Sequence, residues 1–320
     1  MAQQAIQGTI PTLEESERLL TDRSIPLLPL LQAAYRVRYH FFANKVRVHI
    51  LINAQNGYCS EDCNYCAQAA GSEAEITRFR LRSDEEILQG AEEARSKGAY
   101  RYCIVLSGRG LGRERAEHMA SLVREIKSRW PLEVCVSAGF LDQETAVCLK
   151  EAGLDRYNHN LNTAEEYYSS ICTTHGYRER LATLETARAQ GLEVCSGIII
   201  GMGETPDQVV EVAHTLRRLN ARSIPVNFYV HVPGSALGEK NFLTPELGLR
   251  ALCLFRFCNP DAEIRAAGGR EVNLRGLESL ALYPASGLFS EGYLNTGGLA
   301  NDRTLNLIRD AGFEVESIES

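Results

Sequence analysis

Three cysteines stand within eight residues of one another, at Cys59, Cys63 and Cys66. Thiolates are the ligands that soft metals and iron–sulfur clusters select. A structural zinc site normally takes four protein ligands, and the next cysteine after Cys66 is Cys103. Three ligands suffice for a [4Fe-4S] cluster that leaves one iron open to a cofactor. We therefore predict such a cluster, with zinc as the alternative and three incidental cysteines as the least favoured interpretation.

Three more cysteines, Cys103, Cys135 and Cys195, each stand in the middle of a short apolar segment, and a fourth such segment carries Arg265. Free cysteines are common in protein cores, so one alone would indicate packing. An arginine in a core needs anionic company, however. If these four side chains point inward from neighbouring strands, they meet near one axis. We therefore predict a second, auxiliary metal cluster there.

The elements that must position these residues alternate along the chain. Eight short segments, several of them rich in Val and Ile, favour strands, at residues 46–53, 101–108, 132–139, 156–162, 192–201, 223–232, 263–269 and 287–292. Amphipathic segments favour helices at residues 83–97, 113–130, 142–151, 177–190, 206–220, 244–257 and 302–310. Ser83 and Glu86 form a capping-box pattern, and Thr244 precedes Pro245 as an N-cap would.

This alternation predicts parallel βαβ units and a (β/α)8 TIM-type barrel, with functional groups at the carboxyl ends of the strands. A doubly wound open sheet is the structural alternative, because periodicity cannot show closure. No linker divides the 320 residues, so we predict one domain, 1–320, with residues 1–36 as a helical N-terminal extension.

Composition excludes several classes. The chain is 44% hydrophobic and 23% charged, so it can bury a large core, and its net charge of −7 argues against nucleic-acid binding. No apolar run approaches the ~20 residues needed to span a membrane. The N-terminus lacks a signal-peptide pattern, so we expect a cytoplasmic protein. Ten cysteines in that reducing compartment indicate metal or redox chemistry rather than disulfides.

The C-x3-C-x2-C spacing, with Tyr65 before the third cysteine, resembles the radical S-adenosylmethionine superfamily. The resemblance implies that the open iron chelates the methionine part of S-adenosylmethionine, and that an electron from the cluster cleaves it to a 5′-deoxyadenosyl radical. From about Val46 to Phe313 the chain is similar to the biotin synthases in particular. The matching tracts are CSEDCNYCAQ, GLDRYNHNLNT, CSGIIIGMGET and IRAAGGRE.

That resemblance implies roles for individual residues. An auxiliary cluster, [2Fe-2S] and the sulfur donor, would be held by Cys103, Cys135, Cys195 and Arg265. S-adenosylmethionine would contact Tyr65 and the turn at Gly201 and Glu204 through its adenine, Asn160 and Asn162 through its ribose, and Arg180 through its carboxylate. Dethiobiotin would face Asn158, Asn160 and Asn227, with its carboxylate at Asn295 and Thr296.

Asn162 departs from the family pattern, in which we expect an aspartate. Asparagine still hydrogen-bonds a hydroxyl group but brings no charge. The departure allows an auxiliary cluster with a different iron and sulfide count.

The resemblance implies sulfur insertion into dethiobiotin. The radical abstracts hydrogen from the methyl carbon, the carbon radical attacks a sulfide of the auxiliary cluster, and a second S-adenosylmethionine repeats the abstraction to close the ring. A flavodoxin- or ferredoxin-type electron donor and a homodimer are also implied. The alternatives are a methylornithine synthase or hydrogenase maturase, which would not need the second cysteine set, and a non-catalytic iron–sulfur protein.

Other signals favour structural roles. The glycines in residues 108–112 follow a strand and precede a helix but lack the full dinucleotide-binding pattern, so we predict a loop at the barrel mouth. His159 is the only histidine we place near the site, in a structural role. The remaining cysteines are predicted to be packing residues: Cys148, Cys172, Cys253 and Cys258.

Overall fold

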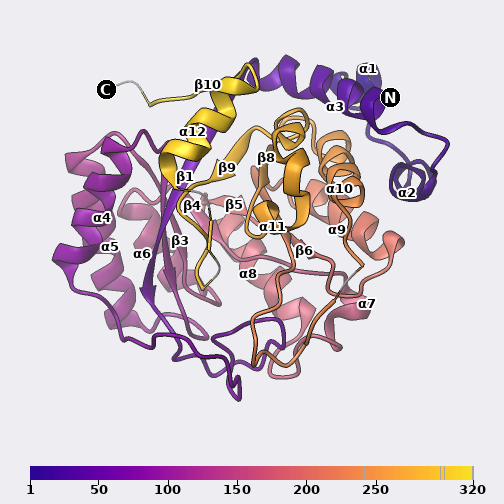
Figure 1. Ribbon diagram of the computed structural model, residues 1–320. Helices are drawn as coiled ribbons and strands as arrows, with labels where there is room; N and C mark the ends of the chain where they lie inside the picture. Colours follow the sequence, from indigo (N-terminus) through magenta and orange to yellow (C-terminus); the bar gives the residue numbers. More distant parts are fainter. Residues whose placement is uncertain (241, 296, 299, 319–320) are drawn as a thin grey trace.

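A closed parallel barrel forms the centre of the computed structural model, which describes residues 1–240, 242–295, 297–298 and 300–318 (Figure 1). Its strands are β1 (Lys45–Gln55), β2 (Arg101–Leu106), β3 (Glu133–Ser137), β4 (Arg156–Asn158), β5 (Glu193–Cys195), β6 (Ile198–Ile200), β7 (Ser223–Phe228), β8 (Glu263–Ala266) and β9 (Gly287–Phe289). Neighbouring strands pair in parallel in chain order, with β5 and β6 both beside β7, and β9 pairs back to β1. The predicted (β/α)8 barrel is confirmed, and the open sheet is excluded.

Helices between the strands surround the barrel: α4 (Asp84–Ser96), α5 (Arg113–Arg129), α6 (Gln143–Glu151), α8 (Tyr177–Ala189), α9 (Pro206–Arg218), α10 (Pro245–Cys258) and α12 (Asn301–Asp310). The predicted caps are present. Ser83 Oγ accepts from the Glu86 backbone N–H at 3.3 Å, and the Glu86 carboxylate accepts from the Ser83 N–H at 3.0 Å. Thr244 Oγ1 accepts from the Leu247 N–H at 3.2 Å, which satisfies one donor of the first helical turn.

The N-terminal helices α1 (Ala2–Ile6), α2 (Leu13–Thr21) and α3 (Leu27–Phe42) lie at the end of the barrel where the strands begin, at the top of Figure 1. Arg38 fixes α3 there by donating to the carbonyls of Ala285 at 3.1 Å and Lys45 at 2.7 Å. The helical extension that we expected before about Arg36 therefore continues to Phe42. It leaves the carboxyl ends of the strands uncovered for function.

The fifth predicted strand is interrupted at Ser196 and Gly197, and its two parts are β5 and β6. A Cβ atom on Gly197 would lie 1.8 Å from the carbonyl oxygen of Pro225 on β7, so only glycine fits this approach. Four short elements were not predicted: α7 (Glu165–Tyr168), α11 (Arg270–Leu274), a 3₁₀ helix (Arg275–Leu282) and β10 (Glu314–Val315). They are too short to show a hydrophobic period.

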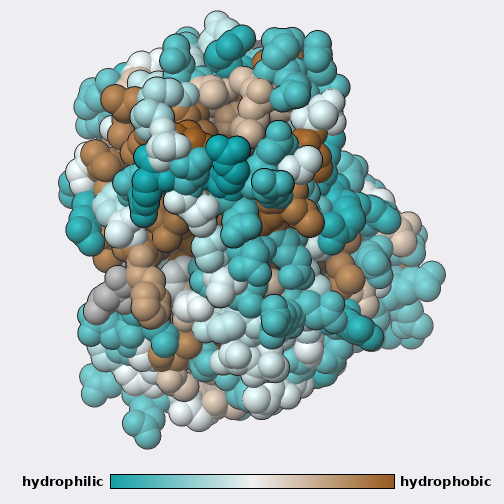
Figure 2. Space-filling view, turned by 90° about the vertical axis from the view of Figure 1, so that its right-hand side faces the viewer, coloured by the Kyte–Doolittle hydropathy of each residue, from teal (hydrophilic) through white to brown (hydrophobic). Residues whose placement is uncertain are grey.

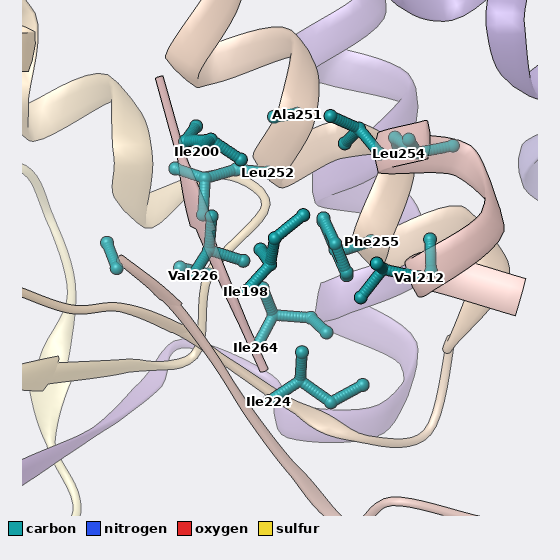
Figure 3. Packing of buried hydrophobic residues seen from close by; sticks show 14 of the residues in the cluster. Ile198, Ile200, Val212, Ile224, Val226, Ala251, Leu252, Leu254, Phe255 and Ile264 are labelled. Carbon is teal, nitrogen blue, oxygen red and sulfur yellow. The ribbon is translucent and has the colours of Figure 1, made fainter. Parts of the chain in front are cut away.

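The main core lies between the outside of the barrel and the helices. Figure 3 shows Ile198, Val226 and Ile264, from β6, β7 and β8, packed toward Val212 of α9 and Phe255 of α10, and all five are fully buried. Burying a side chain of this kind contributes about 1.5–3 kcal/mol. On the side of the molecule seen in Figure 2, the surface is mostly hydrophilic, with small apolar patches. None of the helices in the described part of the chain is both long and apolar enough to cross a membrane.

Candidate active site

Inside the barrel, the layer nearest the start of the strands is charged. Arg101 of β2 donates to Glu263 of β8 at 2.9 and 3.2 Å and to Glu133 of β3 at 2.5 Å. His49 of β1 lies 3.2 Å from Arg101 and 3.1 Å from Glu263, and all three side chains are at most 1% exposed. Sequence analysis did not find this layer. It fills the end of the barrel where the strands begin.

The acids of this layer remain ionised. Burial opposes the charge on Glu263, but Arg101 and His49 outweigh it and hold its pKa well below the usual value. The same pairing raises the pKa of Arg101 despite its burial. The layer is therefore a set of mutually compensated buried charges, and removing one member would leave another unpaired.

The next layer, two residues further along the strands, brings together the second cysteine set. Cys103 and Cys135 are direct cross-strand neighbours on β2 and β3, and Cys195 on β5 is the neighbour of Asn158 on β4. All three thiols are buried. Arg265 on β8 donates to Cys195 Sγ at 3.0 Å. The prediction that these side chains meet inside the barrel is confirmed.

Two features of this layer fit an anionic, thiolate-bound group. Arg265 is 1% exposed, yet its Nε and Nη1 have no hydrogen-bond partner among the described residues. Such buried donors are costly unless an acceptor occupies the space. A hydrogen bond from Cys135, and then the charge of Arg265, also lower the pKa of Cys195. A cluster held by thiolates would satisfy both the guanidinium and the acidic thiol.

Above this layer a cavity of about 300 Å³ opens at the carboxyl ends of the strands. Its lining includes nearly all of the predicted site residues: Cys59, Cys63, Tyr65, Cys66, Cys103, Cys135, Asn158, Asn160, Asn162, Arg180, Cys195, Asn227, Arg265 and Asn295. Among the described residues predicted for the site, Gly201 and Glu204 do not line it. Thr296 lies outside the described residues.

The loop with the first three cysteines crosses the mouth of this cavity between β1 and α4. Backbone bonds tie it to distant segments, since the Asn64 N–H donates to the Ile171 carbonyl at 2.9 Å and the Asn64 carbonyl accepts from Leu237 at 2.8 Å. Cys63 is buried, whereas Cys59 and Cys66 are half-buried. Burial raises the pKa of Cys66. A thiol of this kind loses its proton when it coordinates a metal.

Arg180 of α8 reaches the cavity from the side. Its Nη1 donates to the Asn160 carbonyl at 2.8 Å, its Nη2 contacts His175 Nε2 at 3.2 Å, and its Nε donates to the Tyr168 hydroxyl. A guanidinium has five donors. The second N–H of Nη1 makes only a long contact, 3.5 Å to His159 Nε2, and the second N–H of Nη2 faces no acceptor among the described residues, so a ligand can take both. This pair suits a carboxylate.

The asparagines of the site are held by one another and by the backbone. Asn162 adopts φ +70°, which asparagine tolerates, and donates to the Tyr65 hydroxyl at 2.5 Å. Asn158 donates to Asn160 Oδ1 at 3.2 Å. Asn295 exchanges two amide hydrogen bonds with Asn56, at 3.0 and 3.1 Å, so its orientation is fixed across the mouth.

The Glu204 carboxylate accepts from the backbone N–H groups of Gly201, Met202 and Gly203 at 2.6, 2.9 and 3.1 Å. Burial raises the pKa of this carboxyl group. In the structure Glu204 therefore shapes its own turn after β6.

One prediction about the histidines is wrong. His159 is not the only histidine at the site, because His175 also lines the cavity and contacts Arg180. Cys172 is buried in the core, as a packing residue would be, and its Sγ also lies 3.7 Å from Cys63 Sγ. Cys172 and His175 follow a C-x2-H spacing in the sequence, and this signal could have been noticed. The loop at residues 108–112 is confirmed as a strand-to-helix connection between β2 and α5.

Known proteins share both the sequence and the fold. Residues 56–216 match the radical SAM superfamily, and residues 225–314 match the biotin and thiamin synthesis associated domain. The biotin synthase of Magnetococcus marinus is 66% identical over 319 residues, which cover 100% of this chain and 99% of that protein. The biotin synthase of Acaryochloris marina is 52% identical over 297 residues, 93% of this chain and 86% of that protein.

Solved structures of more distant proteins share the fold. A methylornithine synthase superposes with a TM-score of 0.82 at 21% identity, covering 98% of this chain and 97% of that one. An FeFe-hydrogenase maturase from Carboxydothermus hydrogenoformans gives a TM-score of 0.82 at 17% identity, covering 98% and 78%. At this identity the likeness supports the barrel and not the reaction.

Proposed function

The chain belongs to the biotin synthases of the radical S-adenosylmethionine superfamily, and we propose that its barrel inserts sulfur into dethiobiotin to form biotin. The observation that carries this function is the meeting of two cysteine sets on one cavity. One set stands on a loop at the mouth, and the other lies inside the barrel beside the half-satisfied Arg265. A substrate in the cavity lies between them.

The three loop cysteines, Cys59, Cys63 and Cys66, would hold the [4Fe-4S] cluster that the family uses with S-adenosylmethionine. Cys103, Cys135, Cys195 and Arg265 would hold the auxiliary cluster, for which we propose [2Fe-2S]. When bound, these groups supply the radical and the sulfur, which no acid or base of the chain could provide for unactivated C–H bonds.

The chain's own residues would bind and orient S-adenosylmethionine. One N–H on each terminal nitrogen of Arg180 would hold its carboxylate, with Nη1 giving up its long contact of 3.5 Å to His159, because the other three donors are bound to the protein. Tyr65 would lie beside the adenine, and Asn160 and Asn162 would contact the ribose. The Tyr65–Asn162 hydrogen bond supports this arrangement, because it holds both groups at the same wall of the cavity.

Dethiobiotin would lie deeper, against Asn158, Asn160 and Asn227. Asn227 accepts from the Gly268 N–H at 3.1 Å and donates to the Ile198 carbonyl at 3.2 Å, so its amide is held in one orientation. We propose Asn295, with Thr296, at the substrate carboxylate, since Asn295 lines the cavity and its pairing with Asn56 fixes its amide. The turn from Gly201 to Glu204 would support the adenine indirectly, through the strand end that it shapes.

We propose further that residues 1–320 form one domain, because both family matches contribute strands to the same closed barrel. A flavodoxin- or ferredoxin-type donor would reduce the loop cluster, whose Cys59 and Cys66 are only half-buried. A cytoplasmic homodimer is the arrangement that the family resemblance supports.

Two variants separate the two cysteine sets. Cys63→Ala should abolish deoxyadenosine formation, because it removes a ligand of the loop cluster. Cys195→Ala should retain much of the S-adenosylmethionine cleavage but form no biotin. Cys148→Ala, which changes a half-buried cysteine on α6, is the matched control and should keep both activities. Full biotin formation by Cys195→Ala would show that the auxiliary site is misassigned.

A further inference from the structure

Beneath the loop, Cys63 belongs to a second group of ligand atoms. Cys63, Cys172 and His175 are all buried, and their sulfur and nitrogen atoms lie within 4.8 Å of one another. We propose that the chain, while it carries no iron–sulfur cluster on the loop, binds one divalent transition-metal ion of the Zn²⁺ type through these three side chains.

The spacing of the two sulfur atoms is that of a tetrahedral site. With Zn–S of about 2.3 Å and Zn–N of about 2.0–2.1 Å, two sulfur ligands lie about 3.8 Å apart, and sulfur and nitrogen lie about 3.6 Å apart. Cys63 Sγ and Cys172 Sγ are 3.7 Å apart, and Cys172 Sγ is 3.6 Å from His175 Nε2. The spacing of the two sulfur atoms therefore needs no change. Cys172 Sγ, which also lies 3.3 Å from His175 Nδ1, must move toward the Nε2 side of the ring, and the Tyr168 and Arg180 donors must leave Nε2.

The histidine is already oriented for a metal. His175 Nδ1 lies 2.6 Å from Oε2 of the buried Glu61, so Nδ1 carries the proton and Nε2 presents its lone pair. The Nε2 atom now faces two donors, the Tyr168 hydroxyl at 2.9 Å and Arg180 Nη2 at 3.2 Å. A carboxylate on the distal nitrogen of a ligating histidine is the usual outer partner in zinc sites.

Charge also favours a divalent ion here. Two thiolates neutralise its charge, so the nearby Arg180 faces a neutral complex. Asp62 is not needed as a ligand, because it accepts from the backbone N–H groups of Thr173 at 2.9 Å and Thr174 at 3.1 Å. Three protein ligands leave the fourth position for water.

The ion and the loop cluster would exclude each other, because both use Cys63. The site therefore belongs to the cluster-free chain and would form whichever reaction the complete enzyme catalyses. It would hold the loop to α8 and α7 through Cys172 and His175 until iron and sulfide replace the ion.

The test uses the full-length chain with Cys59→Ala and Cys66→Ala, which removes the rival loop thiolates but keeps the proposed site. The protein is stripped with a chelator, kept reduced and anaerobic, and titrated with Co²⁺, whose tetrahedral thiolate complexes absorb strongly in visible light. The same chain with Cys172→Ala added is the test variant. The same chain with Cys148→Ala, in a different core cluster, is the matched control.

The parent and the Cys148→Ala chain should bind one more equivalent of tetrahedral Co²⁺ than the Cys172→Ala chain, whose remaining uptake reports the barrel thiols. Zn²⁺ should displace that cobalt and raise the melting temperature of the parent more than that of the Cys172→Ala chain, in which only the barrel thiols still bind the ion. Melting each chain without metal shows that it is folded, and Cys172→Ser replaces the alanine variant if that one is destabilised. Equal Co²⁺ stoichiometry and spectra with and without Cys172 would overturn the site.

Discussion

Glu263→Gln tests the charged layer that fills the end of the barrel where the strands begin. The change keeps the shape of the side chain but removes the charge that pairs with Arg101 at 2.9 and 3.2 Å and lies 3.1 Å from His49. Removing one partner of a buried pair costs about 3–5 kcal/mol. We take the lower end, about 3 kcal/mol, because glutamine can still accept hydrogen bonds and Arg101 keeps Glu133.

That free energy translates into a melting temperature. At about 2.1 cal/mol/K per residue, a chain of 320 residues unfolds with an entropy of about 0.7 kcal/mol/K. A loss of ~3 kcal/mol therefore lowers the melting temperature by about 4–5 °C.

The assay is circular-dichroism melting of cluster-free protein at pH 7, with all chains scanned at one rate. Glu117→Gln is the control, because Glu117 pairs with Arg113 on the surface of α5, where both side chains are more than half exposed. An exposed pair contributes less than about 0.5 kcal/mol, so the control should melt within about 1 °C of wild type. If Glu263→Gln melts no lower than Glu117→Gln, the buried layer does not stabilise the barrel as described.

Three further changes follow from the same contacts. The fold lowers the pKa of Glu263, so its ionised carboxylate contributes stability that is present above the carboxyl's unfolded pKa and lost as pH falls. The stability of wild type should therefore fall more steeply with acid than that of Glu263→Gln. Parallel stability curves in pH-dependent melts would contradict this. Gly197→Ala places a Cβ 1.8 Å from the Pro225 carbonyl oxygen and should cost more than ~3 kcal/mol or prevent soluble expression, whereas Gly276→Ala, with open space around it, should be neutral in the same melts. Arg180→Lys loses a bidentate fork and should raise the KM for S-adenosylmethionine about tenfold or more. Arg178→Lys, which changes an exposed residue of the same helix, should leave the KM unchanged. An unchanged KM in Arg180→Lys would remove Arg180 from the carboxylate site.

The barrel could be predicted from the sequence because its signals are local. Several strands are Val- and Ile-rich runs, such as β1, β2, β3 and β6, and caps such as Ser83 and Thr244 mark where helices begin. The interruption at Gly197 could not be predicted in this way, because its cause is the approach of Pro225 from another strand. Such a contact exists only once the sheet has formed.

The charged layer was missed, although the sequence holds a signal for it. Side chains in a strand alternate between faces, so Arg101 points to the same side as Cys103, and Glu263 to the same side as Arg265. Once the cysteine and arginine were predicted to face inward, the charged residues two positions earlier had to face inward as well.

The residues that lie next to Cys63 could be identified only from the folded structure. Cys172 and His175 are more than a hundred residues away along the chain and reach it only through the loop around α7. No local pattern brings such residues together, so a single cysteine in a turn was interpreted as packing.

The most direct test of the central claim is an anaerobic assay of reconstituted protein with dithionite, S-adenosylmethionine and dethiobiotin, with products identified by mass spectrometry. The account predicts biotin together with 5′-deoxyadenosine. Deoxyadenosine without biotin would keep the radical chemistry but contradict the proposed substrate. Neither product, from protein with verified iron and sulfide, would contradict the account as a whole.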